Sequence, residues 1–85
     1  MPTRKITMLY FAAVRERFGK GREELELPQE ISDIRALSAW LERERPVLRG
    51  ALAQCRFAVG EEFRDASHRL EAGDVIAVIP PVSGG

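Results

Sequence analysis

Residues 75–79 read Val75-Ile76-Ala77-Val78-Ile79. This unbroken apolar run is typical of a strand in the interior of a sheet. The chain then continues as Pro80-Pro81-Val82-Ser83-Gly84-Gly85. Because proline lacks the N–H that a sheet ladder needs, the two prolines are expected to end the strand. We therefore predict a core strand that leads directly into an extended, flexible tail, residues 81–85, whose last residue presents an unhindered carboxylate.

A second apolar stretch lies near the start of the chain, where residues 5–11 form a predicted strand. Alternate side chains of a strand point to the same face. One face of this strand carries Ile6, Met8 and Tyr10. As the two most apolar strands, residues 5–11 and 75–79 are expected to lie in the centre of the sheet.

The other predicted elements are a helical turn at 12–18, a strand at 23–27, a helix at 33–45, a helical or turn segment at 47–53, and strands at 55–59 and 62–64. Ser32 is the predicted N-cap of the main helix, and Pro46 stops it. Gly60 and Glu61 are expected to form a hairpin turn. The order predicts an α+β fold of the β-grasp type, with a mixed sheet of four to five strands and one main helix on one face. We expect one domain, residues 1–80, followed by the tail, residues 81–85.

The composition restricts the classes of partner. The chain has 85 residues, of which 13 are Lys or Arg and 13 are Asp or Glu. Nucleic-acid and anionic-membrane binders show a basic excess, so we expect neither kind of partner. No apolar run approaches the ~20 residues of a membrane span. With Cys55 as its only cysteine and no leader sequence, the chain is expected to be cytoplasmic.

One helix covers only one face of the predicted sheet. The apolar residues predicted on the other face are Leu9, Phe11, Phe63, Ala77 and Ile79. An exposed apolar patch of this kind usually marks a docking surface. The alternative is that a loop such as residues 15–22 folds over the patch. The tail leaves from the same end of the sheet, and its five residues span at most ~17 Å at ~3.3 Å each, enough to reach a buried site on a docked partner.

Catalytic chemistry is sparse in this sequence. His68 has no plausible catalytic partner, and Cys55 and Trp40 are predicted to pack at the core. The charged run 42–45 is expected to be a solvated helix face. We see no metal-ligand spacing and no nucleophile–base pair, so we expect no metal and no cofactor bound by this chain. We therefore expect another enzyme to attach the reactive atom to this chain, because no side chain of the chain itself supplies one.

Three segments together resemble a known family. They are Leu9-Tyr10-Phe11-Ala12-Ala13-Val14-Arg15-Glu16, the turn Leu70-x-x-Gly73-Asp74, and the ending Pro80-Pro81-Val82-Ser83-Gly84-Gly85. In this order they resemble the small, sulfur-carrying subunit of molybdopterin synthase (the MoaD family), over nearly the whole chain. The ending is the most specific of the three.

The resemblance implies a ubiquitin-like β-grasp fold and a sulfur cycle. An E1-like, MoeB-like enzyme would use ATP to adenylate Gly85, and a sulfurtransferase would convert the adduct to a thiocarboxylate. The carrier would dock on the large, MoaE-like subunit, in a heterotetramer, and donate sulfur to cyclic pyranopterin monophosphate. The residues that would thread into the large subunit are Pro81, Val82, Ser83 and Gly84. The docking residues of the family correspond to Phe11, Phe63 and Ile79, to which the face argument adds Leu9.

Three alternatives stay open. A sulfur carrier for thiamine or another pathway shares the fold and the Gly-Gly end. A ubiquitin-like protein modifier would form isopeptide bonds through Gly85. An interaction module with an inert tail would keep its function after Gly85 is deleted.

Overall fold

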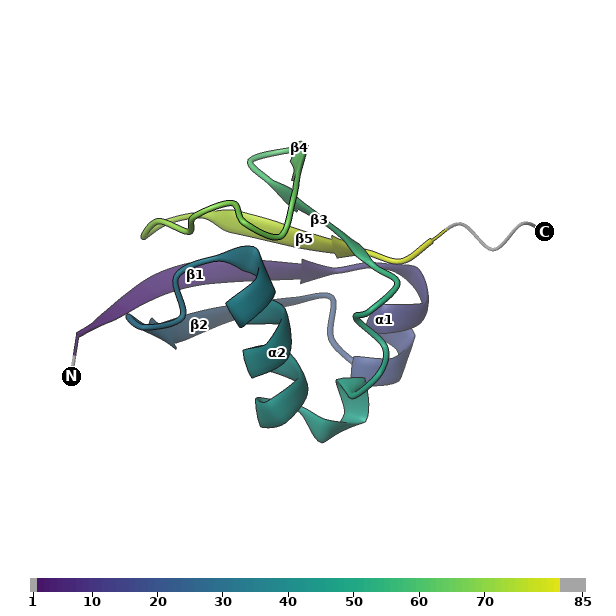
Figure 1. The fold of residues 1–85 in the computed structure, drawn as a ribbon. Helices are drawn as coiled ribbons and strands as arrows, with labels where there is room; N and C mark the ends of the chain where they lie inside the picture. Colours follow the sequence, from purple (N-terminus) through teal and green to yellow (C-terminus); the bar gives the residue numbers. More distant parts are fainter. Residues whose placement is uncertain (1, 82–85) are drawn as a thin grey trace.

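The computed structural model describes residues 2–81 (Figure 1). The predicted site residues Val82, Ser83, Gly84 and Gly85 lie outside the described residues. The elements are β1 (Thr3–Tyr10), α1 (Ala12–Phe18), β2 (Arg22–Pro28), α2 (Ile34–Glu44), the 3-10 helix η1 (Pro46–Leu48), β3 (Arg56–Val59), β4 (Glu62–Arg64) and β5 (Val75–Ile79).

The strands form one five-stranded sheet in the order β2-β1-β5-β3-β4. The neighbours β1 and β5 run parallel, with Met8 opposite Ile76, whereas the other strand pairs are antiparallel. The two most apolar strands therefore lie in the interior of the sheet, as predicted. The mixed sheet, with its main helix on one side, confirms the predicted α+β architecture (Figure 1).

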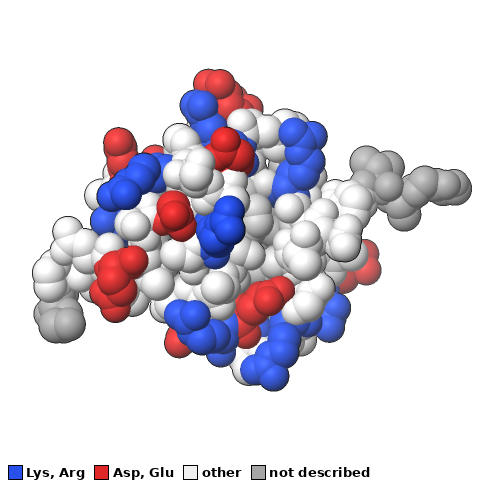
Figure 2. Space-filling model, in the orientation of Figure 1, with Lys and Arg blue, Asp and Glu red and all other residues white. Residues whose placement is uncertain are grey.

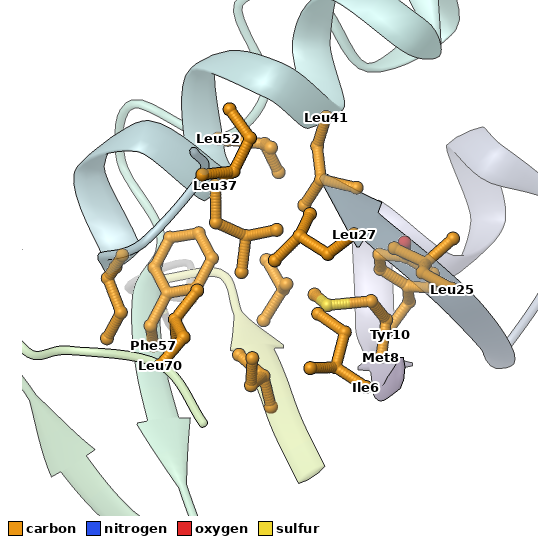
Figure 3. Packing of buried hydrophobic residues seen from close by; sticks show 14 of the residues in the cluster. Ile6, Met8, Tyr10, Leu25, Leu27, Leu37, Leu41, Leu52, Phe57 and Leu70 are labelled. Carbon is orange, nitrogen blue, oxygen red and sulfur yellow. The ribbon is translucent and has the colours of Figure 1, made fainter. Parts of the chain in front are cut away.

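The core lies between α2 and one face of the sheet. From α2, Leu37 and Leu41 are fully buried, and they meet side chains that alternate along β1, β2 and β5 (Figure 3). The fully buried strand residues there include Ile6, Met8, Tyr10, Leu27, Ile76 and Val78. Removing one such side chain from water contributes roughly 1.5–3 kcal/mol. This face of the sheet therefore stabilises the fold.

The main helix begins one residue later than predicted. Asp33, not Ser32, is the N-cap: its Oδ1 accepts a hydrogen bond from the Ala36 N–H at 2.8 Å. Ser32 instead uses its carbonyl oxygen to accept the Leu70 N–H at 2.9 Å. Ser32 is therefore tied to a distant loop, and the aspartate next to it supplies the cap that a helix start requires.

The prediction that residues 42–45 form a solvated helix face was wrong for two of the four. Glu42 Oε2 accepts hydrogen bonds from the Gly50 and Leu52 N–H groups at 2.9 and 3.2 Å. Arg45 Nη2 donates to Glu23 Oε1 at 2.8 Å. The positions of these two residues along the helix predicted exposure to solvent. Their partners lie elsewhere in the sequence, in β2 and in the segment after η1, so the helical pattern by itself could not show them.

Glu23 is the centre of a small polar network beside the core, because Tyr10 also donates its hydroxyl proton to this carboxylate. Burial by itself would raise the pKa of Glu23, but the hydrogen bonds from Arg45 and Tyr10 outweigh it and lower the pKa. The hydrogen bond to Glu23 raises the pKa of Arg45, and burial raises that of Tyr10. The ion pair is therefore held in its charged form.

Candidate docking interface

The sheet face opposite α2 carries a cluster of apolar side chains. We call the depression that they line the apolar hollow; it measures about 540 Å³. Its lining residues are Leu9, Phe11, Ala58, Gly60, Glu61, Phe63, Val75, Ala77 and Ile79. All five residues predicted for the uncovered face are among them. The structure thus brings together side chains from β1, β4 and β5, and their role in docking stays a prediction.

The shape of the apolar hollow follows from strand register. Ala58 of β3 lies opposite Ala77 of β5 on one side and opposite Phe63 of β4 on the other. The two alanines are too small to fill the space above the sheet, so they form its floor. The aromatic side chains of Phe11 and Phe63 remain 45% and 51% exposed. Large exposed rings beside a depression can bury much additional area against a partner.

Phe11 owes its position to the start of α1. The chain leaves β1 through Phe11, which is extended, and Ala12, whose φ of 51° lies in the left-handed region. This reversal turns the following residues toward the helical side of the sheet, where Val14 is buried. The Phe11 side chain therefore stays on the opposite face of the sheet, where it lines the apolar hollow.

The segment 15–22 does not cover the apolar hollow. Phe18 packs edge-on against Tyr10, with ring centroids 5.0 Å apart. Tyr10 points to the α2 side of the sheet, so this segment covers the opposite face from Leu9. The alternative in which this loop hides the apolar patch is therefore wrong for the described residues.

Several features of the hollow were missed by the sequence prediction. Ala58 lines it, and the Arg56 guanidinium lies over the Phe63 ring, 3.8 Å from its centroid. Alternation along residues 55–59 places Ala58 on the sheet face opposite to that of Phe57, and this pattern could have identified Ala58 as a lining residue. The predicted hairpin turn is confirmed, since Gly60 and Glu61 both have positive φ, at 58° and 72°. Such angles suit a two-residue hairpin loop.

The base of the predicted tail lies beside α1. β5 ends at Ile79 and points toward the end of the molecule where α1 lies (Figure 1). Pro80 is half-buried and Pro81 is exposed. They line a shallow hollow of about 240 Å³ together with residues of α1 and with Ala51. The chain therefore leaves the sheet at the end where Phe11 and Ile79 border the apolar hollow.

His68 and Cys55 occupy structural positions. The His68 carbonyl accepts the Ile34 N–H at 3.1 Å, at the start of α2. Cys55 is half-buried, packs against the core and donates its thiol to the Ala51 carbonyl at 3.3 Å. Burial raises the pKa of this thiol, which disfavours the reactive thiolate.

Within residues 2–81 no group of three or more His, Cys, Asp or Glu side chains is placed to hold a metal ion. The helices of the same range are all too short and too polar to cross a membrane.

Comparison with known proteins identifies the family. The sequence model of the ThiS family matches residues 8–85. The chain belongs to the ThiS family. A human relative in this family, a molybdopterin synthase sulfur carrier subunit, is 39% identical over 90 residues, which cover 100% of this chain and 99% of the relative. A relative of the same name from Mycobacterium tuberculosis is 38% identical over 82 residues, 95% of this chain and 98% of that protein.

Solved structures agree with this assignment. A putative molybdopterin converting factor subunit 1 from Pyrococcus furiosus has a TM-score of 0.78 and 29% identity, covering 93% of this chain and 99% of that one. In a Helicobacter pylori complex of subunits 1 and 2 of molybdopterin-converting factor, the matching chain has a TM-score of 0.69 and 26% identity, with 95% and 99% covered. A Caldiarchaeum subterraneum ubiquitin, 15% identical with a TM-score of 0.62 and 99% and 100% covered, shares the fold alone. The fold is therefore ubiquitin-like β-grasp, and the family resemblance predicted from three sequence segments is confirmed.

Proposed function

We propose that this chain is the sulfur carrier subunit of a molybdopterin synthase. The observation that carries the proposal is its similarity, along its whole length, to curated proteins of that name. The apolar hollow beside the base of the tail supports it, because a carrier needs a docking surface next to the group that it delivers. The subunit complex of the Helicobacter pylori relative supports a large subunit as the docking partner.

The proposed chemistry takes place on the carboxylate of Gly85. An E1-like enzyme would join this carboxylate to the α-phosphate of ATP and release pyrophosphate. A sulfurtransferase would then deliver one sulfur atom at the oxidation level of sulfide to the acyl carbon. The new C–S bond forms as the bond from the acyl carbon to AMP breaks, so that AMP leaves and a thiocarboxylate remains. The chain itself supplies no catalytic side chain in this scheme. ATP is a substrate of the activating enzyme, and the cytoplasm is the proposed location.

The described residues would contribute positioning. The large subunit would dock on the apolar hollow and contact its lining residues Phe11, Phe63, Ile79 and Leu9. Pro81 would begin the segment that threads into that subunit, followed by Val82, Ser83 and Gly84. Glycines at the end permit close approach of the backbone to a narrow channel. The sulfur would be donated there to cyclic pyranopterin monophosphate.

Intact-mass measurement tests the carrier function. The chain is incubated with its activating enzyme, ATP and a sulfur source. We expect a mass increase equal to the exchange of one oxygen for sulfur, located at Gly85 by fragmentation. Reactions without ATP, and a chain that lacks Gly84 and Gly85, are the controls. An unchanged mass in the complete reaction would refute the proposal.

The acceptor separates this function from its nearest alternatives. The loaded carrier is mixed with the large subunit and cyclic pyranopterin monophosphate, and the sulfur content of the pterin is followed. Transfer to a thiazole precursor instead would identify a thiamine carrier. Isopeptide-linked conjugates without any sulfur transfer would identify a protein modifier.

A further inference from the structure

An arginine lies on the open face of the sheet, at the border of the apolar hollow. Arg56 of β3 stands directly opposite Ile79 of β5, so the two side chains point to the same face. Phe63 of β4 lies opposite Ala58, two residues further along β3. Arg56 and Phe63 are therefore diagonal neighbours on adjacent strands, and a long side chain can bridge that separation. The Arg56 guanidinium does so, and it lies 3.8 Å from the centroid of the Phe63 ring.

The contact of Arg56 is a stack on a ring and not an ion pair. The chain has 13 basic and 13 acidic residues, and the two kinds of side chain are interspersed on the face of the protein that Figure 2 shows. The ion pairs formed within residues 2–81 do not involve Arg56. Its flat guanidinium is well suited to stacking on an aromatic face. What distinguishes Arg56 is therefore the ring that it covers.

The Phe63 ring has an apolar surface beside it that it leaves uncovered. Ala58 and Ala77 form the floor of the apolar hollow, and Ala58 lies directly opposite Phe63. The ring nevertheless remains 51% exposed. Rotation of the ring onto the two alanines would remove apolar area from water, which is favourable. A ring in that position would fill part of the hollow and leave less room for the side chains of a partner.

Stacking on Arg56 opposes this rotation of the ring. The guanidinium covers one face of the Phe63 ring, so the ring cannot turn onto the alanines without breaking the contact or moving the arginine with it. The cation–π attraction therefore favours the orientation in which the ring stays at the border of the hollow. An aromatic side chain that is already held in one orientation also loses less conformational entropy when a partner binds it.

We propose that Arg56 is a positioning residue for docking: its guanidinium holds the Phe63 ring at the border of the apolar hollow and keeps the hollow open for the large subunit. Arg56 acts through the ring, and this role requires no contact between the arginine and the partner. The inference rests on the proposed function for the identity of the partner. The orientation of the ring, however, is a property of the free chain and is tested without the partner.

The first test observes the ring in the free, full-length chain. Arg56→Gln removes the cation. The control, Arg64→Gln, removes the same charge from an exposed residue of β4 that lies opposite the buried Phe57, on the other face of the sheet. A ring that moves onto the alanines shifts the NMR signals of the Ala58 and Ala77 methyl protons upfield. We expect this shift in Arg56→Gln and not in Arg64→Gln, with thermal denaturation as the folding control.

The second test is a double-mutant cycle on the affinity for the purified large subunit. Arg56→Gln should weaken binding about three- to tenfold, Arg56→Lys should weaken it less, and Arg64→Gln should bind like the wild type. In a chain that already carries Phe63→Ala, adding Arg56→Gln should change the affinity less than about twofold, because the ring through which Arg56 acts is gone. An equal loss with and without the ring would mean that Arg56 contacts the partner directly, and it would overturn the inference.

The two tests separate this inference from the proposed function. If the wild-type chain binds the large subunit, but Arg56→Gln leaves the alanine methyl signals or the affinity unchanged, only the role of Arg56 fails. If the wild-type chain does not bind the large subunit at all, the proposed function itself fails, and the role of Arg56 in docking fails with it.

Discussion

The two faces of the sheet differ in what their side chains do, although the same strands supply both. On the face toward α2, Met8, Ile76 and Val78 are fully buried. On the other face, Leu9 and Ala77 from the same strands line an open hollow. A strand can therefore hold the fold together with every second residue while the residues between them remain available for binding. Substitutions on the two faces should consequently affect different measurements.

The largest expected effect is on the α2 face. Leu37→Ala removes a fully buried side chain and leaves a cavity, so it should lower the free energy of unfolding by about 2–5 kcal/mol. Urea denaturation followed by circular dichroism measures this change. A loss below about 1 kcal/mol would mean that the helix packs less tightly than its burial indicates.

The matching substitution on the open face should leave stability nearly unchanged and affect binding. Phe63→Ala removes a ring that is 51% exposed. If the ring is an anchor of the interface, the affinity for the large subunit should fall by about 2 kcal/mol, or roughly thirtyfold. Calorimetric titration measures the affinity, and the denaturation midpoint provides the folding control. Unfolding of the variant, or unchanged affinity, would remove the distinction between the two faces.

A smaller effect is expected for the ion pair between Glu23 and Arg45, which lies beside the core on the α2 face. Glu23→Gln breaks the partly buried pair with Arg45, whose side chains are 9% and 22% exposed, and should cost about 1–2 kcal/mol at neutral pH. The matched control is Glu24→Gln, since Glu24 forms only an exposed pair with Arg22.

The same pair predicts a pH dependence of stability. The pKa of Glu23 in the folded chain lies below its ordinary value of 4.5, so its stabilising contribution is complete above that value. It is lost as the pH falls through the folded pKa. Thermal denaturation at several pH values should show a smaller acid-induced loss for Glu23→Gln than for the wild type. Parallel pH profiles would contradict this assignment.

The smallest expected effect concerns the turn that places Phe11 on the open face. Ala12 has a φ of 51°, which glycine adopts without steric cost. Ala12→Gly should therefore raise stability by up to about 1 kcal/mol, whereas Ala13→Gly, within α1, should lower it by about 0.5–1 kcal/mol. Chemical denaturation distinguishes the two signs. Equal destabilisation would show that the turn at Ala12 is unstrained.

The strands and their faces could be predicted because alternation is a local property. The strand at residues 75–79 and the hairpin turn at Gly60-Glu61 have the predicted bounds. The cap of α2 was missed by one residue because Ser32 and Asp33 are both good caps. The choice between them depends on Leu70, which lies far away in the sequence.

The candidate site was predicted in part for the same reason. Strand alternation identified which apolar residues avoid the helix, but not that Ala58 and Ala77 would leave a hollow floor between the rings. The position of Arg56 over Phe63 requires the register between β3 and β4, which no local pattern contains.

By itself, the sequence determined the type of each main element, the two faces of its strands and the family to which the chain belongs. Each of these depends on residues within a few positions of one another or on motifs in a fixed order. Only the tertiary structure decided which side chains share a hollow, that Glu23 pairs with Arg45, and that the Arg56 guanidinium lies over Phe63. These contacts depend on strand register and on how α2 lies across the sheet, which the packing of the whole core sets.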